Sequence, residues 1–338
     1  RFNSLLNMNM IILLFFISSL TMFMSGLVAN FEYDLKKIIA LSTLSQLGLM
    51  MSILALGEEV LAFFHLLMHA LFKALLFMCA GSMIHSMNGC QDIRYMGSMI
   101  NSIPLTSCFF NICSMALCGL PFLSGFYSKD LILEFMSMNF FNVYVYLIYY
   151  LSIGLTVMYS LRLMYYTLIK EFQGFSYFSV MEESNFMLKG MAGLIFLVIF
   201  AGSLMSWFIF PTPIFICLPV FMKVMVLLLM LMGGIISLLI FQLSYVDYSK
   251  TLKFYNISSF MMSMWNLSGL TTFGLNYYFL FYSGKFISLL DQGWSEYYGS
   301  QNLYNSLKYE SSLFQIIYNN NIKIFLTLFF IWICMLIF

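Results

Sequence analysis

The sequence predicts an all-α protein, a polytopic bundle of transmembrane helices. Of the 338 residues, 62% are hydrophobic and only 9% are charged, whereas a soluble domain carries about 25% charged residues. The apolar residues also form unbroken runs, each long enough to cross about 30 Å of hydrocarbon as a helix. Such runs exclude a transmembrane barrel, whose strands alternate apolar and polar residues. The formal net charge of +1 gives the chain no electrostatic attraction for nucleic acid.

Apolar runs place the expected spans in order along the chain. They cover residues 10–29, 38–56, 60–87, 104–135 with an interruption at 119–125, 140–169, 189–210, 221–245 and 322–338. The second span carries small polar residues that favour close helix packing, so we expect it to face protein. The third is long for one crossing, which predicts a tilt or a local break. Gly233 and Gly234 in the seventh span predict close packing or a bend.

Residues 246–321 have a different character from the spans. Apolar side chains recur at three- to four-residue intervals there, in a pattern that is interrupted near Gly299. This period indicates an amphipathic helix. We expect it to lie along a surface, of lipid or of neighbouring subunits, rather than to span the membrane.

The most informative stretch lies in the third span, where His65, His69 and Lys73 interrupt an apolar run. Residues spaced by four drift only about 40° per step around a helix and rise about 6 Å, so the three form one polar stripe. Ionisable groups in a membrane span are costly unless they face one another or water. The stripe therefore predicts a proton or cation relay. The alternative is that its hydrogen bonds only fix the helix register.

A second candidate site lies where the fourth span is interrupted. Pro121 lacks an N–H group and clashes with the preceding turn, which predicts a broken helix. Broken helices at membrane depth are buried in protein or line water-filled cavities. We expect Ser128 to cap the second half-helix, with Lys129 and Asp130 in its first turn as further relay groups. The alternative is that Lys129 and Asp130 mark a membrane interface by snorkelling.

Three further ionisable residues are weaker candidates. Asp34 fits a loop and helix start as well as a site, and His85 fits a histidine at the membrane interface. Glu134 lies one turn beyond Asp130 and is expected to pair with it or with Lys129. Arg162, near the end of the fifth span, is expected to snorkel.

The seven cysteines show no Cys-x-x-Cys spacing and lie mostly in apolar segments. They indicate small buried hydrophobic residues rather than disulfides, zinc ligands or iron–sulfur ligands. We therefore predict no metal and no cofactor bound by this chain. Because the chain starts at Arg1 without an initiator methionine, we expect an N-terminal portion to be missing.

Four strings of residues resemble a known family. They are DLKKIIALSTLSQLG at 34–48, HLLMHALFKALLF followed by CAG within 65–81, QDIR at 91–94, and GLPFLSGFYSKD at 119–130. In these strings the chain is similar to the mitochondrial NADH dehydrogenase (ubiquinone) subunit 5 family, the antiporter-like membrane subunits of respiratory complex I. A looser similarity extends over the whole chain.

The resemblance implies a core proton-translocating subunit of NADH:ubiquinone oxidoreductase, multi-pass in the mitochondrial inner membrane. Lys73 matches the central lysine of the family, His65 and His69 its histidine partners, and Lys129 with Asp130 the terminal pair. Electron transfer from NADH through FMN and iron–sulfur clusters to ubiquinone would occur in other subunits. The implied partners are lipid and the other membrane-arm subunits, especially the adjacent antiporter-like subunits along the lateral helix.

The resemblance also implies four segments. Residues 1–169 would form the second antiporter-like repeat, 170–246 additional transmembrane helices, 247–321 the amphipathic lateral segment and 322–338 a C-terminal anchor. Two alternative functions remain open at this point: a free-standing cation/proton antiporter, and a structural subunit of the membrane arm. Purification within a large or a small particle would separate the antiporter from a complex subunit.

Overall fold

The computed structural model describes residues 5–138, 143–174, 180–182, 185–212, 215–243, 254–319 and 321–337. The chain divides into two units, Arg1–Trp265 and Asn266–Phe338, and each is described here by itself. The predicted span start at Phe140, span end at Tyr245 and segment boundary at 246–247 lie outside the described residues.

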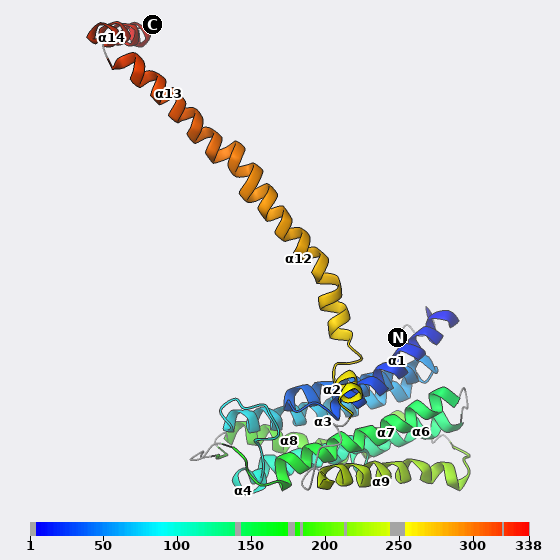
Figure 1. Ribbon diagram of the computed structural model, residues 1–338. Helices are drawn as coiled ribbons and strands as arrows, with labels where there is room; N and C mark the ends of the chain where they lie inside the picture. The colour runs from blue at the N-terminus through cyan, green and yellow to red at the C-terminus, as the bar shows by residue number, and fades with distance from the viewer. Residues whose placement is uncertain are drawn as a thin grey trace. The chain divides into compact units, whose positions relative to one another are not determined.

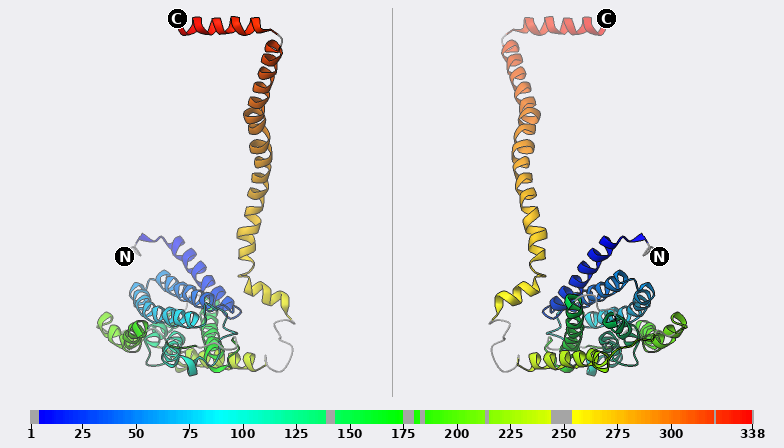
Figure 2. Two further views of the ribbon diagram at one scale, coloured as in Figure 1. Left: turned by 90° about the vertical axis from the view of Figure 1, so that its left-hand side faces the viewer. Right: turned by 90° about the vertical axis from the view of Figure 1, so that its right-hand side faces the viewer.

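Long helices packed side by side make up the first unit (Figures 1 and 2). They are α1 (Met8–Ala29), α2 (Leu35–Ala55), α3 (Glu59–Ser86), α4 (Met99–Ser102), α5 (Pro104–Cys118), α6 (Ser124–Met138), α7 (Val143–Met164) with the π-helical turn η2 (Tyr165–Ile169), α8 (Asn185–Ile209), α9 (Val220–Leu243) and α11 (Tyr255–Met262). Among the described residues, six helices are long and apolar enough to cross a membrane. The predicted polytopic helical bundle is confirmed.

The third span forms one continuous helix rather than a broken one. Helix α3 has 28 residues, which extend about 42 Å at 1.5 Å per residue. Glu59 lies in its first turn and His85 in its last turn, where the helix dipole favours a negative and a positive charge respectively. The uninterrupted helix keeps the spacing of the polar stripe regular.

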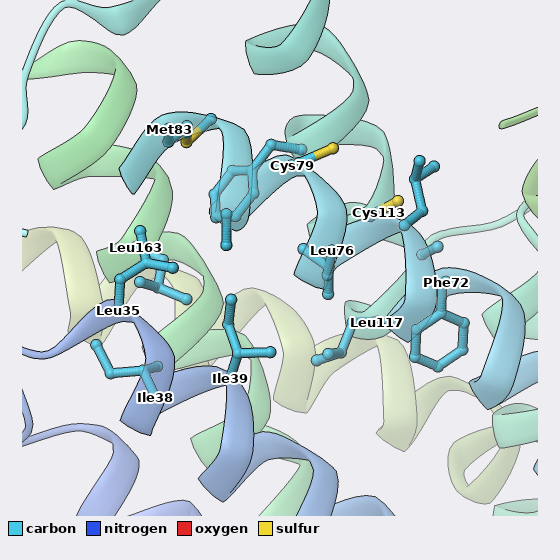
Figure 3. Close-up of a cluster of buried hydrophobic side chains, with 14 of the residues drawn as sticks. Leu35, Ile38, Ile39, Phe72, Leu76, Cys79, Met83, Cys113, Leu117 and Leu163 are labelled. Carbon is cyan, nitrogen blue, oxygen red and sulfur yellow. The ribbon is translucent and has the colours of Figure 1, made fainter. Parts of the chain in front are cut away.

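Two core clusters hold the bundle together. The larger joins α2, α3, α5 and α7 (Figure 3), through buried residues that include Ile39, Leu76, Cys113 and Leu163. The buried face of α2 also contains its polar residues Ser42, Ser45 and Gln46, as expected for a protein-facing span. This face gives the polar groups of α2 direct access to α3.

Close packing at Gly233 is confirmed. A Cβ added there would lie 2.8 Å from the Gly154 carbonyl oxygen, so the backbones of α9 and α7 approach too closely for a side chain at Gly233. Residues of this size allow membrane helices to pack backbone against backbone.

A turn separates α5 from α6, within the expected interruption at 119–125, but the expected helix cap at Ser128 is wrong. Helix α5 ends at Gly119, before Pro121, because Gly119 has φ +90° and its N–H donates to the Met115 and Ala116 carbonyls. Glycine adopts this left-handed conformation at little cost. Helix α6 then begins at Ser124, four residues before the expected cap at Ser128.

Ser128 is therefore not a helix cap. It lies in the second turn of α6 together with Lys129 and Asp130. The charge-stabilising effect of the helix dipole falls off within the first turn, so it does not explain the position of these groups. The early start of α6 depends on Gly125, because a Cβ there would collide with the Ala116 carbonyl oxygen of α5.

Gly125→Ala is expected to destabilise the protein by about 1–3 kcal/mol, the usual cost of overpacking a tight contact. The alanine must push α6 away from the C-terminal end of α5. The measurement is thermal unfolding of the purified membrane complex. Gly154→Ala is the control, because a Cβ at Gly154 meets nothing within 4 Å; equal stability of the two variants would contradict the close packing of α5 and α6.

Arg162 does not snorkel as expected; it is buried in α7 with 7% exposure. Its guanidinium donates to the backbone carbonyls of Ala29 at 3.4 Å and Glu32 at 2.7 Å. It also lies 4.7 Å from the ring centroid of Tyr33, which Arg94 approaches at 4.4 Å. A guanidinium at this distance is attracted by the ring face. Arg162 thus fixes the α1–α2 loop to α7.

The same loop is fixed to the segment after α3. An isolated antiparallel bridge joins Asp34 and Asp92, and Asp92 forms an ion pair with Arg94 at 2.5 Å. Burial opposes ionisation of the Asp92 carboxyl, but the hydrogen bonds and charge of Arg94 outweigh it, so the pKa of Asp92 is lowered. The loops at this end of the bundle therefore connect α1, α2, α3 and α7.

Arg162→Ala is expected to loosen the α1–α2 loop, because two carbonyl groups lose their hydrogen-bond donor. Each unsatisfied carbonyl costs about 1–3 kcal/mol of stability. Hydrogen exchange over residues 30–37 should become faster. Arg162→Lys, which keeps a charge and a donor, should restore part of the protection. Unchanged exchange in Arg162→Ala would show that Arg162 does not hold the loop.

The second unit consists of helical segments. They are η3 (Gly269–Gly274), α12 (Leu275–Phe286), η4 (Ile287–Ser295), η5 (Tyr297–Gln301), α13 (Asn302–Tyr318) and α14 (Ile322–Ile337). The expected interruption near Gly299 takes the form of π-helical turns, which let a helix continue while shifting its faces. Exposed apolar side chains recur along it, among them Phe286, Leu290, Trp294 and Tyr297.

Candidate functional site

The polar stripe of α3 is buried inside the first unit. His65 is 1% exposed, His69 8% and Lys73 3%. The surrounding face of α3 is apolar, so each polar atom must find a partner within the protein. Helices α2 and α6 pack against α3 and supply those partners.

Helix α2 provides two polar groups to the stripe. The Lys73 ammonium donates to the Ser42 hydroxyl, and the Ser42 hydroxyl donates in turn to the Ile39 carbonyl at 2.7 Å. One turn further along α2, the Gln46 Oε1 lies 3.3 Å from the His65 Nε2. Two residues of α2 that are four positions apart therefore contact two residues of α3 that are eight positions apart: Ser42 contacts Lys73, and Gln46 contacts His65.

Helix α6 continues the line of contacts. The His65 Nδ1 lies 3.0 Å from the Ser128 hydroxyl, so this one imidazole joins α2 to α6. The next residue, Lys129, is 3% exposed, and its ammonium donates to the Thr156 Oγ1 of α7 at 2.9 Å. Lys129 does not snorkel in this structure.

His69 lies between the two hydrogen-bonded residues of the stripe. Its ring centroid is 6.3 Å from that of His65, and its buried Nε2 has no hydrogen-bond partner in the part of the chain that the structure describes. An unpaired nitrogen in an apolar interior costs about 1–3 kcal/mol. Among the described residues, His69 is therefore the member of the stripe whose ring nitrogens are not all satisfied.

The remaining candidates form no side-chain hydrogen bond with these residues in the described part of the chain, although Asp130 directly follows Lys129. Asp34 precedes α2 and pairs with Lys37 at 2.7 Å near the surface, and His85 is exposed in the last turn of α3. Asp130 and Glu134 are half-buried on α6. Neither forms an ion pair with Lys129 within the described part of the chain, so the expected pairing of Glu134 is not found there.

Sequence reasoning missed two features of the site. Thr156 was not singled out, because a threonine in a tyrosine-rich span carries no signal until α6 is placed beside α7. A second contact, which no local sequence pattern predicts, is made by the Glu182 carboxylate, which accepts from the Thr106 backbone N–H at 2.9 Å. A carboxylate there stabilises the first turn of α5.

The arrangement is suited to moving protons. Four helices contribute buried lysine, histidine and hydroxyl groups in separate contacts, Lys73–Ser42, His65–Ser128 and Lys129–Thr156, and each of these groups can give, accept or hold a proton. Among the described residues no three His, Cys, Asp or Glu side chains gather as metal ligands. Ionisable groups buried inside a helical membrane protein are typical of the class of proteins that move protons or ions.

Comparison with known families agrees with this class. Residues 1–159 match the family described as "NADH:quinone oxidoreductase/Mrp antiporter, TM", and residues 159–338 match "NADH dehydrogenase subunit 5 C-terminus". The chain belongs to the NADH dehydrogenase subunit 5 family.

Individual relatives agree with this assignment. The chain is 48% identical over all 338 residues to NADH-ubiquinone oxidoreductase chain 5 of Aedes aegypti, and covers 58% of that relative. It is 49% identical over 321 residues to the chain of the same name from Locusta migratoria, covering 95% of this chain and 56% of the relative. The chain thus spans less than two thirds of the length of these relatives.

Two solved structures share the fold. A chain in the Mrp complex from Dietzia sp. DQ12-45-1b aligns with a TM-score of 0.56 at 22% identity, over 67% of this chain and 27% of that one. A chain of an archaeal respiratory complex, the membrane-bound sulfane sulfur reductase, aligns with a TM-score of 0.52 at 24% identity, over 60% of this chain and 40% of that one. At this identity the likeness concerns the fold alone.

Proposed function

We propose that this chain is a core proton-translocating membrane subunit of an NADH:ubiquinone oxidoreductase. It is a multi-pass protein of the mitochondrial inner membrane, as its membership of the subunit 5 family and its six candidate spans support. Protons move through Lys73, His69, His65, Lys129 and Asp130, while electrons pass from NADH to ubiquinone in other subunits.

One observation carries this proposal. His65 contacts both Gln46 of α2 and Ser128 of α6, which is followed directly by Lys129. A buried imidazole thus lies between the helix that contacts Lys73 and the helix that carries Lys129. A purely structural role would be served as well by apolar residues of similar volume, which usually stabilise a buried position at least as strongly. Groups that bind and release protons serve a relay.

The redox chemistry belongs to partner subunits. The cysteines of the described residues are free, and in this proposal the complex uses NADH, FMN, iron–sulfur clusters and ubiquinone elsewhere. The partners of this chain are lipid and the other membrane-arm subunits, with adjacent antiporter-like subunits contacting the lateral helix. Exposed aromatic and aliphatic residues along α12 and α13 support such contacts, since apolar patches of this kind mark interaction surfaces.

We also propose the division of the chain that the resemblance implies. Residues 1–169 form an antiporter-like repeat in which α5 and α6 are the halves of one broken span, and 170–246 add transmembrane helices. Residues 247–321 form the lateral segment, and 322–338 anchor it in the membrane. The apolar 16-residue helix α14 supports the anchor.

The test is Lys129→Ala in the full-length subunit assembled in its complex. Removing the ammonium should lower the number of protons translocated per NADH oxidised, because Thr156 then loses the buried proton-carrying group that donates to it. Assembly should persist, since the lysine forms no ion pair with a described residue. Vesicle acidification and NADH oxidation are measured together.

Lys36→Ala provides the matched control, because Lys36 is an exposed lysine at the start of α2. Its proton-to-NADH ratio should equal that of the unmodified complex. An unaltered ratio in a fully assembled Lys129→Ala complex would refute the proposed relay.

A further inference from the structure

The buried face of α7 carries hydroxyl groups beyond the one that holds Lys129. Thr156 and Ser160 are four residues apart and 4% and 1% exposed. Side chains at this spacing lie one above the other, about 6 Å apart along the helix. The reach of a lysine side chain covers both hydroxyls.

Both hydroxyls are arranged as hydrogen-bond acceptors. The Thr156 hydroxyl donates its hydrogen to the Ile153 carbonyl at 2.7 Å, and the Ser160 hydroxyl donates to the Val157 carbonyl at 2.9 Å. Each oxygen therefore presents only lone pairs to its surroundings. Such oxygens suit an ammonium group, which has three donors and no acceptor.

The Ser160 oxygen is occupied by a thiol. The Cys118 Sγ lies 2.8 Å from it, and the thiol can be the donor of this contact, because the Ser160 hydroxyl is also within hydrogen-bond distance of the Val157 carbonyl. A thiol is a weak donor, whereas hydrogen bonds from a charged group are about twice as strong as neutral ones. An ammonium would therefore displace Cys118 from Ser160.

Lys129 is placed to do so. Its stem passes beside Gly119, where an added Cβ would lie 3.6 Å from the Lys129 Cδ. Gly119 directly follows Cys118, so the thiol–hydroxyl pair lies beside the backbone over which the lysine extends. The stem of Lys129 therefore lies close to the residue that follows Cys118.

We propose that Ser160 is a second binding position for the Lys129 ammonium, and that Cys118 occupies this position while Lys129 is bound to Thr156. The proton would then be carried along α7 by movement of the lysine between the two hydroxyls. This inference rests on the relay proposed above and makes Ser160 a further site residue, with Cys118 as a positioning residue.

The test measures the initial rate of vesicle acidification during NADH oxidation by the assembled complex, for Thr156→Val, Ser160→Ala and the double variant. Losing one hydrogen bond to a charged group is expected to slow translocation about tenfold in each single variant. Because the positions act in series, the double variant should be no slower than the slower single variant. Ser160→Thr, which keeps the oxygen, should restore the rate.

Ser152→Ala is the matched control. Ser152 lies one turn before Thr156 and is equally buried at 3% exposure, but its hydroxyl contacts Met22 Sδ at 3.4 Å and the Tyr149 carbonyl at 2.7 Å. Its removal should leave translocation unchanged.

A spectroscopic measurement separates movement of Lys129 from a merely structural effect. In Thr156→Val the ammonium should remain on Ser160, so the infrared S–H stretch of Cys118, identified by its loss in Cys118→Ala, should shift to the position of a free thiol. An unshifted band, or full translocation in Ser160→Ala while Lys129→Ala is inactive, would overturn this inference alone. Full translocation in Lys129→Ala would overturn the proposed relay as well.

Discussion

Lys73→Met is expected to abolish most proton translocation by the assembled complex. The thioether fills the volume of the lysine stem but cannot bind a proton, so the relay loses its group at the Ser42 end. Positioned proton-transfer groups contribute about 10²–10⁴-fold in rate, and we expect a loss near the lower figure. The measurement is the initial rate of vesicle acidification during NADH oxidation.

Assembly of the Lys73→Met complex should be preserved. Replacing a buried charge with an apolar residue of similar size is often neutral or stabilising, and Ser42 keeps its bond to the Ile39 carbonyl. A Lys73→Arg variant retains the charge but hardly releases a proton at any physiological pH. It should therefore fail to restore translocation; restoration by arginine would indicate a structural role for the charge.

His65→Gln is expected to have the second-largest effect. It removes the proton-binding imidazole between the two lysines but keeps a polar side chain that can contact Ser128 and Gln46. Glutamine retains a donor and an acceptor for Ser128 and Gln46, but it does not take up a proton. The buried polar groups therefore stay satisfied, and unfolding temperature should change little. Translocation should fall by about 100-fold, again the lower end of the range for proton-transfer groups.

His85→Gln is the control for this variant. It makes the same chemical change at an exposed position on the same helix, α3, outside the proposed relay. Translocation should match that of the unmodified complex. Equal losses in His65→Gln and His85→Gln would show that the effect does not come from the line of buried contacts.

The sequence predicts the parts of the site that depend on one helix alone. The stripe of His65, His69 and Lys73 follows from spacing, because an unbroken helix places every fourth residue on one face. The protein-facing side of α2 follows from its small polar residues in the same way. The structure adds that α2 and α3 meet along these two faces, through Ser42 and Gln46.

The features that sequence reasoning missed depend on contacts between distant segments. The start of α6 is set by Gly125 lying against Ala116, so Ser128 became a partner of His65 instead of a helix cap. Arg162 is held by the carbonyls of the α1–α2 loop, more than a hundred residues earlier. No local pattern encodes such contacts, and a local preference such as capping or snorkelling yields to them.

The central claim is that Lys73 and Lys129 act in series on one proton path. Protons translocated per NADH should be measured in the assembled complex for Lys73→Met, Lys129→Met and the two combined. Residues in one path show strong non-additivity in such a cycle, so the double variant should lose no more than the more severe single variant. Independent losses that multiply in the double variant would contradict a single relay from α3 to α7.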